Sequence, residues 1–169
     1  MKVTAEYLIK KFNLKKHPEG GYYIEVYRSE EFIEKDHLPK RYDSKRSFST
    51  SIYFLLKDDD FSSFHRVMSD EIWHFYAGTS LSMYIIKDNG ELEILILGKD
   101  NEKNESYFGL VKKGNWFAAK TNQTDSYTLV GCTVAPGFDF ADFQLAERQK
   151  LIEQFPKHKE IITQLTRET

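Results

Sequence analysis

The sequence is short of the features that stabilise exported or membrane-bound chains. It contains one cysteine, Cys132, so an internal disulfide cannot form and a disulfide-stapled secreted scaffold is excluded. No apolar run approaches the roughly 20 residues that a membrane-spanning helix needs. The N-terminus carries charged residues too early for the apolar segment of a signal peptide. These absences predict a cytoplasmic protein.

An excess of one charge sign is also missing. The chain has 24 Lys and Arg against 26 Asp and Glu, a net charge of -2 over 169 residues, which gives no general reason to bind nucleic acid. We find no internal repeat and no low-complexity segment. The length suits one domain with a sizeable core. We therefore expect a single domain over residues 1–169, without nucleic acid or membrane among its partners.

Short β-strand patterns separated by turns fill the middle of the chain. Asn89-Gly90 is a strong signal for a tight hairpin turn. A parallel α/β sheet would need helical patterns between the strands, and this region has none. The sequence therefore predicts an all-β sandwich or barrel. The strands are expected at residues 22–27, 48–56, 61–67, 72–77, 81–87, 91–97, 107–111, 115–120 and 127–135.

Helical patterns occur only near the two ends. Residues 5–12 follow Thr4, a suitable N-cap, and have helical apolar spacing. A second helical pattern runs from about Phe143 to Pro156, and a short one covers residues 159–165. Residues 28–47 are highly charged and contain Pro39. We expect them to form an exposed loop, which is a candidate lid for a barrel mouth.

The densest chemistry lies in residues 61–78, F-S-S-F-H-R-V-M-S-D-E-I-W-H-F-Y-A-G. The pattern predicts two strands joined by a turn at residues 68–70. Alternation would put Glu71, Trp73 and Phe75 on one face. We expect His65 and Glu71 to face each other across this hairpin. A histidine beside a carboxylate can act as a base or a metal ligand; the alternative is a structural hydrogen-bonded pair.

This stretch resembles the first cupin motif, G-x5-H-x-H-x3-E-x6-G. His65, Glu71 and Gly78 match it, whereas Asp59 replaces the first glycine and Val67 the second histidine. Three further stretches, H-P-E-G-G-Y-Y, S-D-E-I-W-H-F-Y-A-G and G-C-T-V-A-P-G-F-D-F, are similar to a group of small single-domain cupins related to sugar epimerases. The resemblance implies a double-stranded β-helix, or jelly-roll barrel, with short terminal helices, but no one reaction.

The same resemblance argues against a metal. Cupin metals usually bind three histidines and a glutamate. Here Val67 removes one histidine, and Phe117 stands at the histidine position of the second cupin motif, of which only Gly114 matches. We therefore predict no metal and no cofactor; any ion would depend on His65 and Glu71. The competing hypothesis is that His74, turned inward by a bulge, or Glu25 completes a ligand set.

A barrel interior lined by aromatic residues favours a small organic ligand over an ion. Aromatic residues in strands more often form ordinary core, so packing is the alternative for each one. The expected ligand-lining residues are Tyr23, Glu25, Tyr53, Trp73, Phe75, Trp116 and Phe117.

Other polar residues receive simpler interpretations. Cys132 lies in an apolar strand and is expected to be a buried, inert thiol. His17 is assigned to turn chemistry, and Asp139 and Asp142 to helix capping. A phosphate-binding basic patch beside the barrel mouth is the alternative to a solvated loop for Arg28, Lys40, Arg41, Lys45 and Arg46.

Three functions remain open from the sequence. The first is an isomerase or epimerase of a sugar nucleotide or a sugar-like carbonyl substrate, with His65 as general base, Glu71 orienting or charge-tuning it, and a tyrosine returning the proton. The second is a binding protein that holds a small molecule without chemistry. The third, disfavoured by Val67 and Phe117, is a metal-dependent oxygenase. Exposed edge strands and the resemblance both predict a homodimer.

Overall fold

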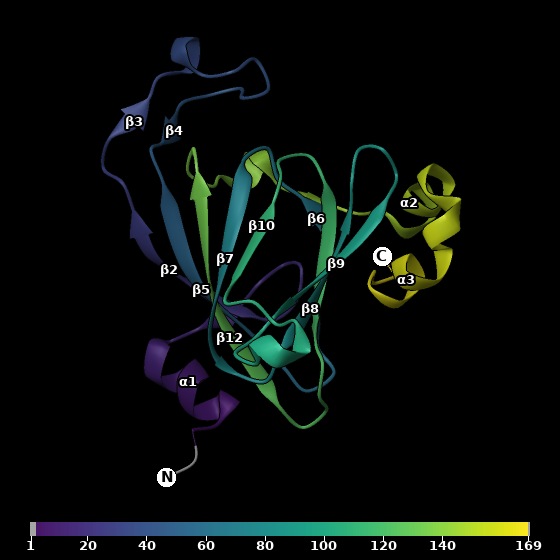
Figure 1. Cartoon of the computed structure of the whole chain (residues 1–169). Coiled ribbons are helices and arrows are strands. Elements are labelled where there is room, and N and C mark those ends of the chain that lie inside the picture. Colours follow the sequence, from purple (N-terminus) through teal and green to yellow (C-terminus); the bar gives the residue numbers. More distant parts are fainter. Residues whose placement is uncertain (1–2, 169) are drawn as a thin grey trace.

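Two antiparallel sheets wrap around a common interior in the computed structural model, which describes residues 3–168 (Figure 1). The all-β prediction is confirmed. The six-stranded sheet has the order β1 (Lys15–Lys16), β2 (Tyr22–Arg28), β5 (Thr50–Lys57), β12 (Tyr127–Ala135), β7 (Asp70–Gly78) and β10 (Phe108–Val111). The five-stranded sheet has the order β13 (Gln144–Leu145), β6 (Phe61–Arg66), β11 (Trp116–Thr121), β8 (Leu81–Ile86) and β9 (Leu92–Leu97).

Side-chain alternation along β7 fills the interior as expected. Glu71, Trp73 and Phe75 are buried, while Ile72 and His74 between them are partly exposed on the outer face. The inward-facing residues of both sheets form one apolar cluster inside the barrel. Its largest members are Phe54, Trp73, Phe75, Met83 and Phe117.

The predicted hairpin of β6 and β7 does not form. The two strands belong to different sheets, so the link between them crosses from one sheet to the other. Val67 in this link is buried and its carbonyl accepts a hydrogen bond from the Gly114 amide at 2.9 Å. Alternation identified which side chains point inward, but it does not specify the neighbouring strand.

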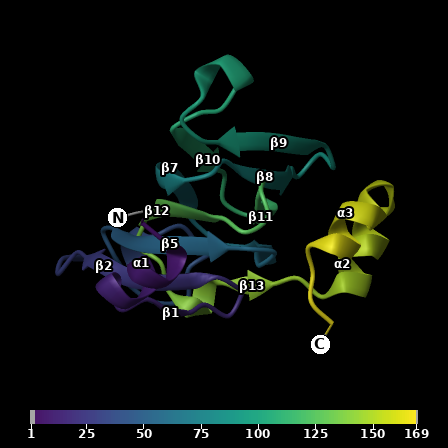
Figure 2. The ribbon, with the colours of Figure 1, turned by 90° about the horizontal axis from the view of Figure 1, so that it is seen from below.

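Helices cover the outer faces of both sheets (Figure 2). α1 (Ala5–Phe12) begins at Thr4, whose hydroxyl accepts the Tyr7 amide at 3.2 Å, and it packs over Leu55 and Leu129. α2 (Arg148–Gln154) and α3 (Lys159–Gln164) pack against the five-stranded sheet. The predicted helical start at residue 143 is wrong, because Gln144 and Leu145 pair with β6 as β13. Short 3₁₀ turns occupy Lys35–His37, Asn101–Lys103, Phe140–Asp142 and Pro156–His158.

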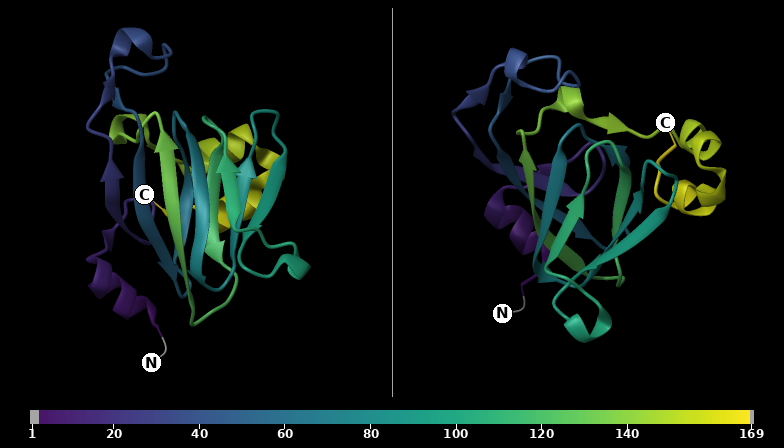
Figure 3. Two further views of the ribbon diagram at one scale, coloured as in Figure 1. Left: turned by 60° about the vertical axis from the view of Figure 1, so that its left-hand side comes forward. Right: turned by 45° about the horizontal axis from the view of Figure 1, so that its top comes forward.

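An arm of residues 29–47 projects beyond one end of the barrel (Figures 1 and 3) and contains the small hairpin of β3 (Phe32–Ile33) and β4 (Arg46–Ser47). We expected a wholly exposed loop, but Tyr42 and Arg46 in the arm are buried. The Tyr42 hydroxyl lies 2.7 Å from Ser69 Oγ. Arg46 donates two hydrogen bonds to Asp142, at 2.6 and 2.7 Å. The arm is therefore anchored to the barrel. None of the helices within residues 3–168 has the length and apolar character needed to cross a bilayer.

Candidate active site

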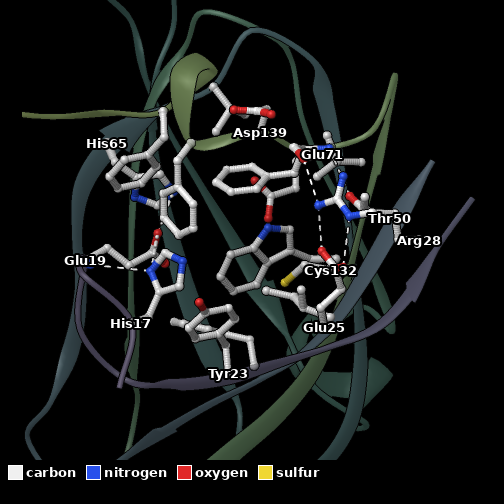
Figure 4. A pocket seen from close by; sticks show the side chains of 18 residues that line it. His17, Glu19, Tyr23, Glu25, Arg28, Thr50, His65, Glu71, Cys132 and Asp139 are labelled. Atoms are coloured by element: carbon white, nitrogen blue, oxygen red, sulfur yellow. Dashed lines mark hydrogen bonds and ion pairs between the residues drawn. The ribbon is translucent and has the colours of Figure 1, made fainter. Parts of the chain in front are cut away.

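A cavity of about 410 Å³ opens at the end of the barrel that carries the arm, and Figure 4 shows its lining. This volume lies within the usual range for small-molecule sites. Apolar residues make up most of the walls, while titratable groups gather at two places within them. The lining consists of His17, Glu19, Tyr23, Glu25, Arg28, Thr50, Ile52, Phe54, His65, Val67, Glu71, Trp73, Cys132, Val134, Phe138, Asp139, Phe140 and Phe143.

Two histidines converge on the carboxyl group of Glu19. His65 Nε2 lies 3.2 Å from Glu19 Oε2, and His17 Nδ1 lies 3.3 Å from the same oxygen. His65 and Glu19 are both at least nine-tenths buried. The phenyl ring of Phe117, paired with His65 across β6 and β11, supports the imidazole at a centroid distance of 4.0 Å. The site therefore contains a cluster of His17, Glu19 and His65. Its carboxyl group, from Glu19, lies outside residues 61–78, the motif that contains His65.

Hydrogen-bond roles fix where a proton must lie in this cluster. His65 Nδ1 is 2.8 Å from the Ser63 carbonyl oxygen; a carbonyl only accepts, so Nδ1 carries a hydrogen. In a neutral imidazole Nε2 is then an acceptor, and it faces Glu19. A stable contact requires either a proton on Glu19 Oε2 or a cationic His65.

Burial selects the uncharged form of this pair. It lowers the pKa of His65 to about 3. Burial and the nearby Glu71 together raise the pKa of Glu19 well above its ordinary value. Both shifts have the sign that desolvation gives when charged forms leave water. The contact geometry and both shifts therefore favour a carboxylic acid on Glu19 that donates toward a neutral His65, with one proton in the contact between them.

The loop from His17 to Gly21 is the turn that its Pro and Gly residues predict, and it carries Glu19 into the interior. Gly20 and Gly21 have φ of 112° and 70°, a region that favours glycine. Ser62 Oγ donates to Glu19 Oε1 at 2.8 Å, and the Ser63 amide donates to the Glu19 carbonyl at 2.8 Å. This loop of the six-stranded sheet is therefore joined directly to β6 of the five-stranded sheet.

A second carboxyl, Glu71, lies on the other side of the cavity, near Cys132 (Figure 4). Burial raises the pKa of Glu71 to about 7, and the neighbouring Trp73 indole and Cys132 thiol counteract part of that shift. Trp73 Nε1 is buried and meets no hydrogen-bond acceptor at ordinary geometry among residues 3–168. Glu71 therefore changes protonation near neutral pH, beside a donor that a ligand oxygen would satisfy.

The cavity rim combines one ion pair with aromatic rings. Arg28 donates to both oxygens of Glu25, at 2.9 and 2.7 Å, and to the Phe138 carbonyl at 3.1 Å. The His17 ring is stacked at 25° on Phe140, with the centroids 6.1 Å apart. Asp139 adds a further carboxylate at the rim and caps the turn that follows by accepting the Ala141 amide.

The phosphate-binding patch that was the alternative to a solvated loop is not assembled at this rim. Of its five members only Arg28 lines the cavity, and Glu25 already pairs with it. Arg46 is buried against Asp142, which corrects the helix-capping role expected for Asp142. Arg41 donates to the Met68 carbonyl at 2.8 Å, and the Lys45 ammonium lies over the Phe32 ring. The position of these residues on a charged segment did not show which of their side chains would bind other groups of the protein instead of facing solvent.

Five of the predicted site residues line the cavity: Tyr23, Glu25, His65, Glu71 and Trp73. Tyr53 and Trp116 do not, because Tyr53 packs against Phe12 of α1 and Trp116 lies in the cluster beneath α2 and α3. Phe75 and Phe117 belong to the barrel core behind the lining. The expected pairing of His65 with Glu71 is wrong, since the partner of His65 is Glu19.

Sequence reasoning missed the roles of Glu19 and His17. Both lie in H-P-E-G-G-Y-Y, a stretch that supported the family resemblance, and His17 was assigned to turn chemistry alone. The usable signal was a carboxylate in a turn with two following glycines. Such a residue is normally solvated, but Glu19 is only 5% exposed.

The alternatives proposed for a metal ligand set do not reach the cavity together. His74 faces outward and contacts Phe108, with ring centroids 6.0 Å apart, and Glu25 is paired with Arg28. Within residues 3–168, no three or more His, Cys, Asp or Glu side chains are arranged to hold a metal ion. His74 therefore lies outside the cavity lining, whereas Glu25 lines the cavity with its carboxylate already paired to Arg28.

Two antiparallel sheets closed around a lined cavity define the jelly-roll class of barrel proteins. Comparison with protein families places the chain within this class. The family described as Cupin superfamily (DUF985) matches residues 6–146, so the chain belongs to this cupin family.

Similar proteins support this assignment. The uncharacterised protein YML079W of Saccharomyces cerevisiae is 30% identical over 149 residues, covering 82% of this chain and 73% of the yeast protein. The crystal structure of protein SO0799 from Shewanella oneidensis is 40% identical, with a TM-score of 0.90 over 99% of this chain and 100% of that one. A hypothetical protein from Leishmania major is 33% identical, with a TM-score of 0.87 over 98% and 100%.

A more distant structural similarity links the chain to an enzyme. Oxalate decarboxylase from Bacillus subtilis has a TM-score of 0.55 and 16% identity, and the match covers 89% of this chain and 36% of that enzyme. At this level of identity the likeness concerns the fold alone.

Proposed function

We propose that this protein binds a small, uncharged, sugar-like hydroxy-carbonyl compound in its barrel and isomerises or epimerises it by proton transfer. The observation that carries the proposal is the buried contact of Glu19 Oε2 with His65 Nε2, 3.2 Å apart in the cavity wall, which suits one proton held between them. General acid–base catalysis needs groups with tuned proton affinity at the reacting atoms. The raised pKa of Glu71, about 7, supplies a second such group.

The two carboxyl groups suit opposite roles. As a carboxylate, Glu71 accepts a proton from the carbon next to the substrate carbonyl, and electrons move toward the carbonyl oxygen to give an enediolate. Trp73 Nε1, which neighbours Glu71 but makes no hydrogen bond of ordinary geometry within residues 3–168, donates to that oxygen. Neutral Glu19, backed by His65, returns a proton to the other face of the same carbon, which gives the epimer. Return to the former carbonyl carbon gives the isomer, and in that case the hydroxyl proton passes from its oxygen to the former carbonyl oxygen. Proton exchange through the open mouth then restores both groups.

Charge in the cavity favours an uncharged substrate. Glu19 and Glu71 are both buried there, and Arg28, the arginine among the cavity-lining residues of the described chain, is paired with Glu25. An anionic group would be desolvated beside these carboxyls without a free cation to pair with. A hydroxy-carbonyl compound offers Glu71 a donor and Trp73 an acceptor. A sugar nucleotide, whose phosphates would need the missing basic patch, is therefore not the substrate that we propose.

Ligand binding without chemistry is the second candidate function. The apolar walls and the unsatisfied Trp73 donor would hold a hydroxylated compound whether or not a proton moved. We do not propose the oxygenase, because His65 and Glu71 gain no further ligand from His74 or Glu25. The free thiol of Cys132 suits a reducing compartment, and we place the activity in the cytoplasm.

Deuterium uptake from heavy water distinguishes these two functions. The protein is incubated with a panel of small aldoses, ketoses and hydroxy-ketones, and NMR measures deuterium at the carbon beside the carbonyl. Catalysis predicts uptake that saturates with substrate. Binding alone predicts saturable shifts in the protein spectrum without uptake, which would contradict the proposed reaction.

Glu19→Gln provides the decisive variant. Its amide can donate to the free nitrogen of His65 and still accept from Ser62, so the fold is preserved while the transferable proton is lost. We expect uptake to fall by about 10²–10⁴-fold. Arg66→Gln, on the outer face of β6, is the control and retains activity. Undiminished uptake by a folded Glu19→Gln protein would refute the assignment.

A further inference from the structure

Arg167 reaches back from the segment after α3 to the loop that carries Glu19. Figure 2 shows this segment turning from the helices toward the barrel. Its guanidinium donates to the Glu19 carbonyl and to Ser63 Oγ. It also donates to Asp60 Oδ1 at 2.7 Å and to the Phe61 carbonyl at 2.8 Å. One side chain thus joins the Glu19 loop to consecutive parts of β6.

Arg167 contacts Glu19 directly and is linked to His65 through Ser63. Ser63 binds Arg167 through its hydroxyl, Glu19 through its amide, and His65 through its carbonyl. Asp60, which holds one edge of the guanidinium, also accepts the Gly21 amide at 3.0 Å. The guanidinium lies against Gly20, where an added Cβ would collide with it. Gly20 therefore permits both the turn and the close approach of Arg167.

We propose that Arg167 is a positioning residue, which clamps the Glu19 loop onto β6 and so sets the contact across which Glu19 and His65 share a proton. This deepens the proposed function without requiring it, because the clamp acts on the resting site. A planar fork with several donors suits the task, since it bonds two chain segments at fixed separation. The charge of Arg167 also acts on Glu19 and lowers its pKa, against the larger effect of burial.

Histidine-selective ¹⁵N NMR of the ligand-free protein tests this role. The two observables are the ring nitrogen shifts of His65 between about pH 5 and pH 8 and the rate at which its Nδ1 hydrogen exchanges with water. Wild-type protein should show a neutral ring with a protected Nδ1 hydrogen. In Arg167→Gln the loop opens more often, because hydrogen bonds from a charged donor are lost, and exchange should accelerate about tenfold or more.

Two further variants separate positioning from general stabilisation. Arg66→Gln removes an arginine of β6, the strand that Arg167 also contacts. The Arg66 guanidinium lies over the Trp116 ring at 4.6 Å and donates to Gln144 at 2.8 Å. This substitution should lower the melting temperature by a similar amount to Arg167→Gln and leave the His65 signals unchanged. Arg167→Lys keeps the charge but not the fork, and it should restore the exchange rate only in part.

Each outcome bears on the proposal. Unchanged His65 shifts and exchange in Arg167→Gln would overturn it, as would an equal effect of Arg66→Gln. If Arg167→Gln does not fold, full protection in Arg167→Lys would show that charge alone suffices and would also overturn the clamp. Altered His65 exchange in a protein that shows no deuterium uptake with any substrate would support the clamp and contradict the proposed reaction, so the two failures are distinguishable.

Discussion

Replacing Arg46 by alanine should destabilise the whole barrel, although Arg46 lies in the projecting arm. The Arg46 side chain is 1% exposed and that of Asp142 6% exposed, and two hydrogen bonds of 2.6 and 2.7 Å join them. Arg46 also donates to the Ser44 carbonyl at 2.9 Å. Arg46→Ala leaves the Asp142 carboxylate in a dry environment without its cation, and the rim turn at Phe140–Asp142 loses its anchor.

The expected loss follows from this burial. Removing one member of a buried ion pair costs about 3–5 kcal/mol. For a chain of this size, 1 kcal/mol corresponds to about 2–4 °C in melting temperature, so Arg46→Ala should melt about 6–20 °C below wild type. Lys112→Ala breaks the pair with Asp70, in which the Lys112 side chain is 63% exposed, and should cost about 0–1 kcal/mol.

Chemical denaturation monitored by tryptophan fluorescence, together with thermal melting, measures both variants. The double variant Arg46→Met, Asp142→Leu removes both charges and should recover most of the stability lost by Arg46→Ala. A loss below about 1 kcal/mol for Arg46→Ala would refute the reasoning, because it would mean that water reaches the Asp142 carboxylate.

Four further predictions concern the titration of two buried groups, metal content and assembly. Burial raises the pKa of Glu71 from 4.5 to about 7, so its contribution to stability is present below about pH 4.5 and is lost as pH rises through 7; Glu71→Gln should abolish this part of the pH dependence of unfolding. Burial lowers the pKa of His65 from 6.5 to about 3, so its contribution is lost as pH falls from about 6.5 toward 3, and His65→Asn should flatten that limb. Elemental analysis of protein purified without added metal should find well under one equivalent of any transition ion, and a stoichiometric ion lost in His65→Asn would contradict this. Light scattering should give the mass of a homodimer, because β1 pairs with only the start of β2 and leaves Val26 and Tyr27 exposed near that edge; a monomer mass would contradict it.

The sequence predicted the fold well because its signals were local and repeated. Alternating residues placed Glu71 and Trp73 inside the barrel, and the Thr4 cap located the start of α1. The errors arose where distant segments decide the structure. The pattern of residues 61–78 does not show that β6 and β7 enter different sheets, and Leu145 matches a helical stripe although it extends β6 through β13.

The candidate site was predicted only in half for the same reason. His65 and Glu71 were found because they lie in one motif. Glu19, the partner of His65, lies in a distant loop: it is 43 positions from Ser62, the β6 residue whose hydroxyl also binds its carboxyl group. A turn sequence such as H-P-E-G-G has the composition of a solvated loop. The burial of Glu19 depends on how the two sheets pack together. The buried pair of Arg46 and Asp142, which lie 96 positions apart in the sequence, likewise depends on the tertiary structure.

The contact of Glu19 with His65 crosses the seam between the two halves of the barrel. Glu19 belongs to the loop between β1 and β2 of one sheet, and His65 to β6 of the other. Any separation of the two sheets here lengthens this contact, while changes that leave the Glu19 loop and β6 in place do not. The imidazole NMR resonances of His65 should therefore report on the contact between the two sheets. A loss of that contact should be detectable even in variants altered far from the cavity.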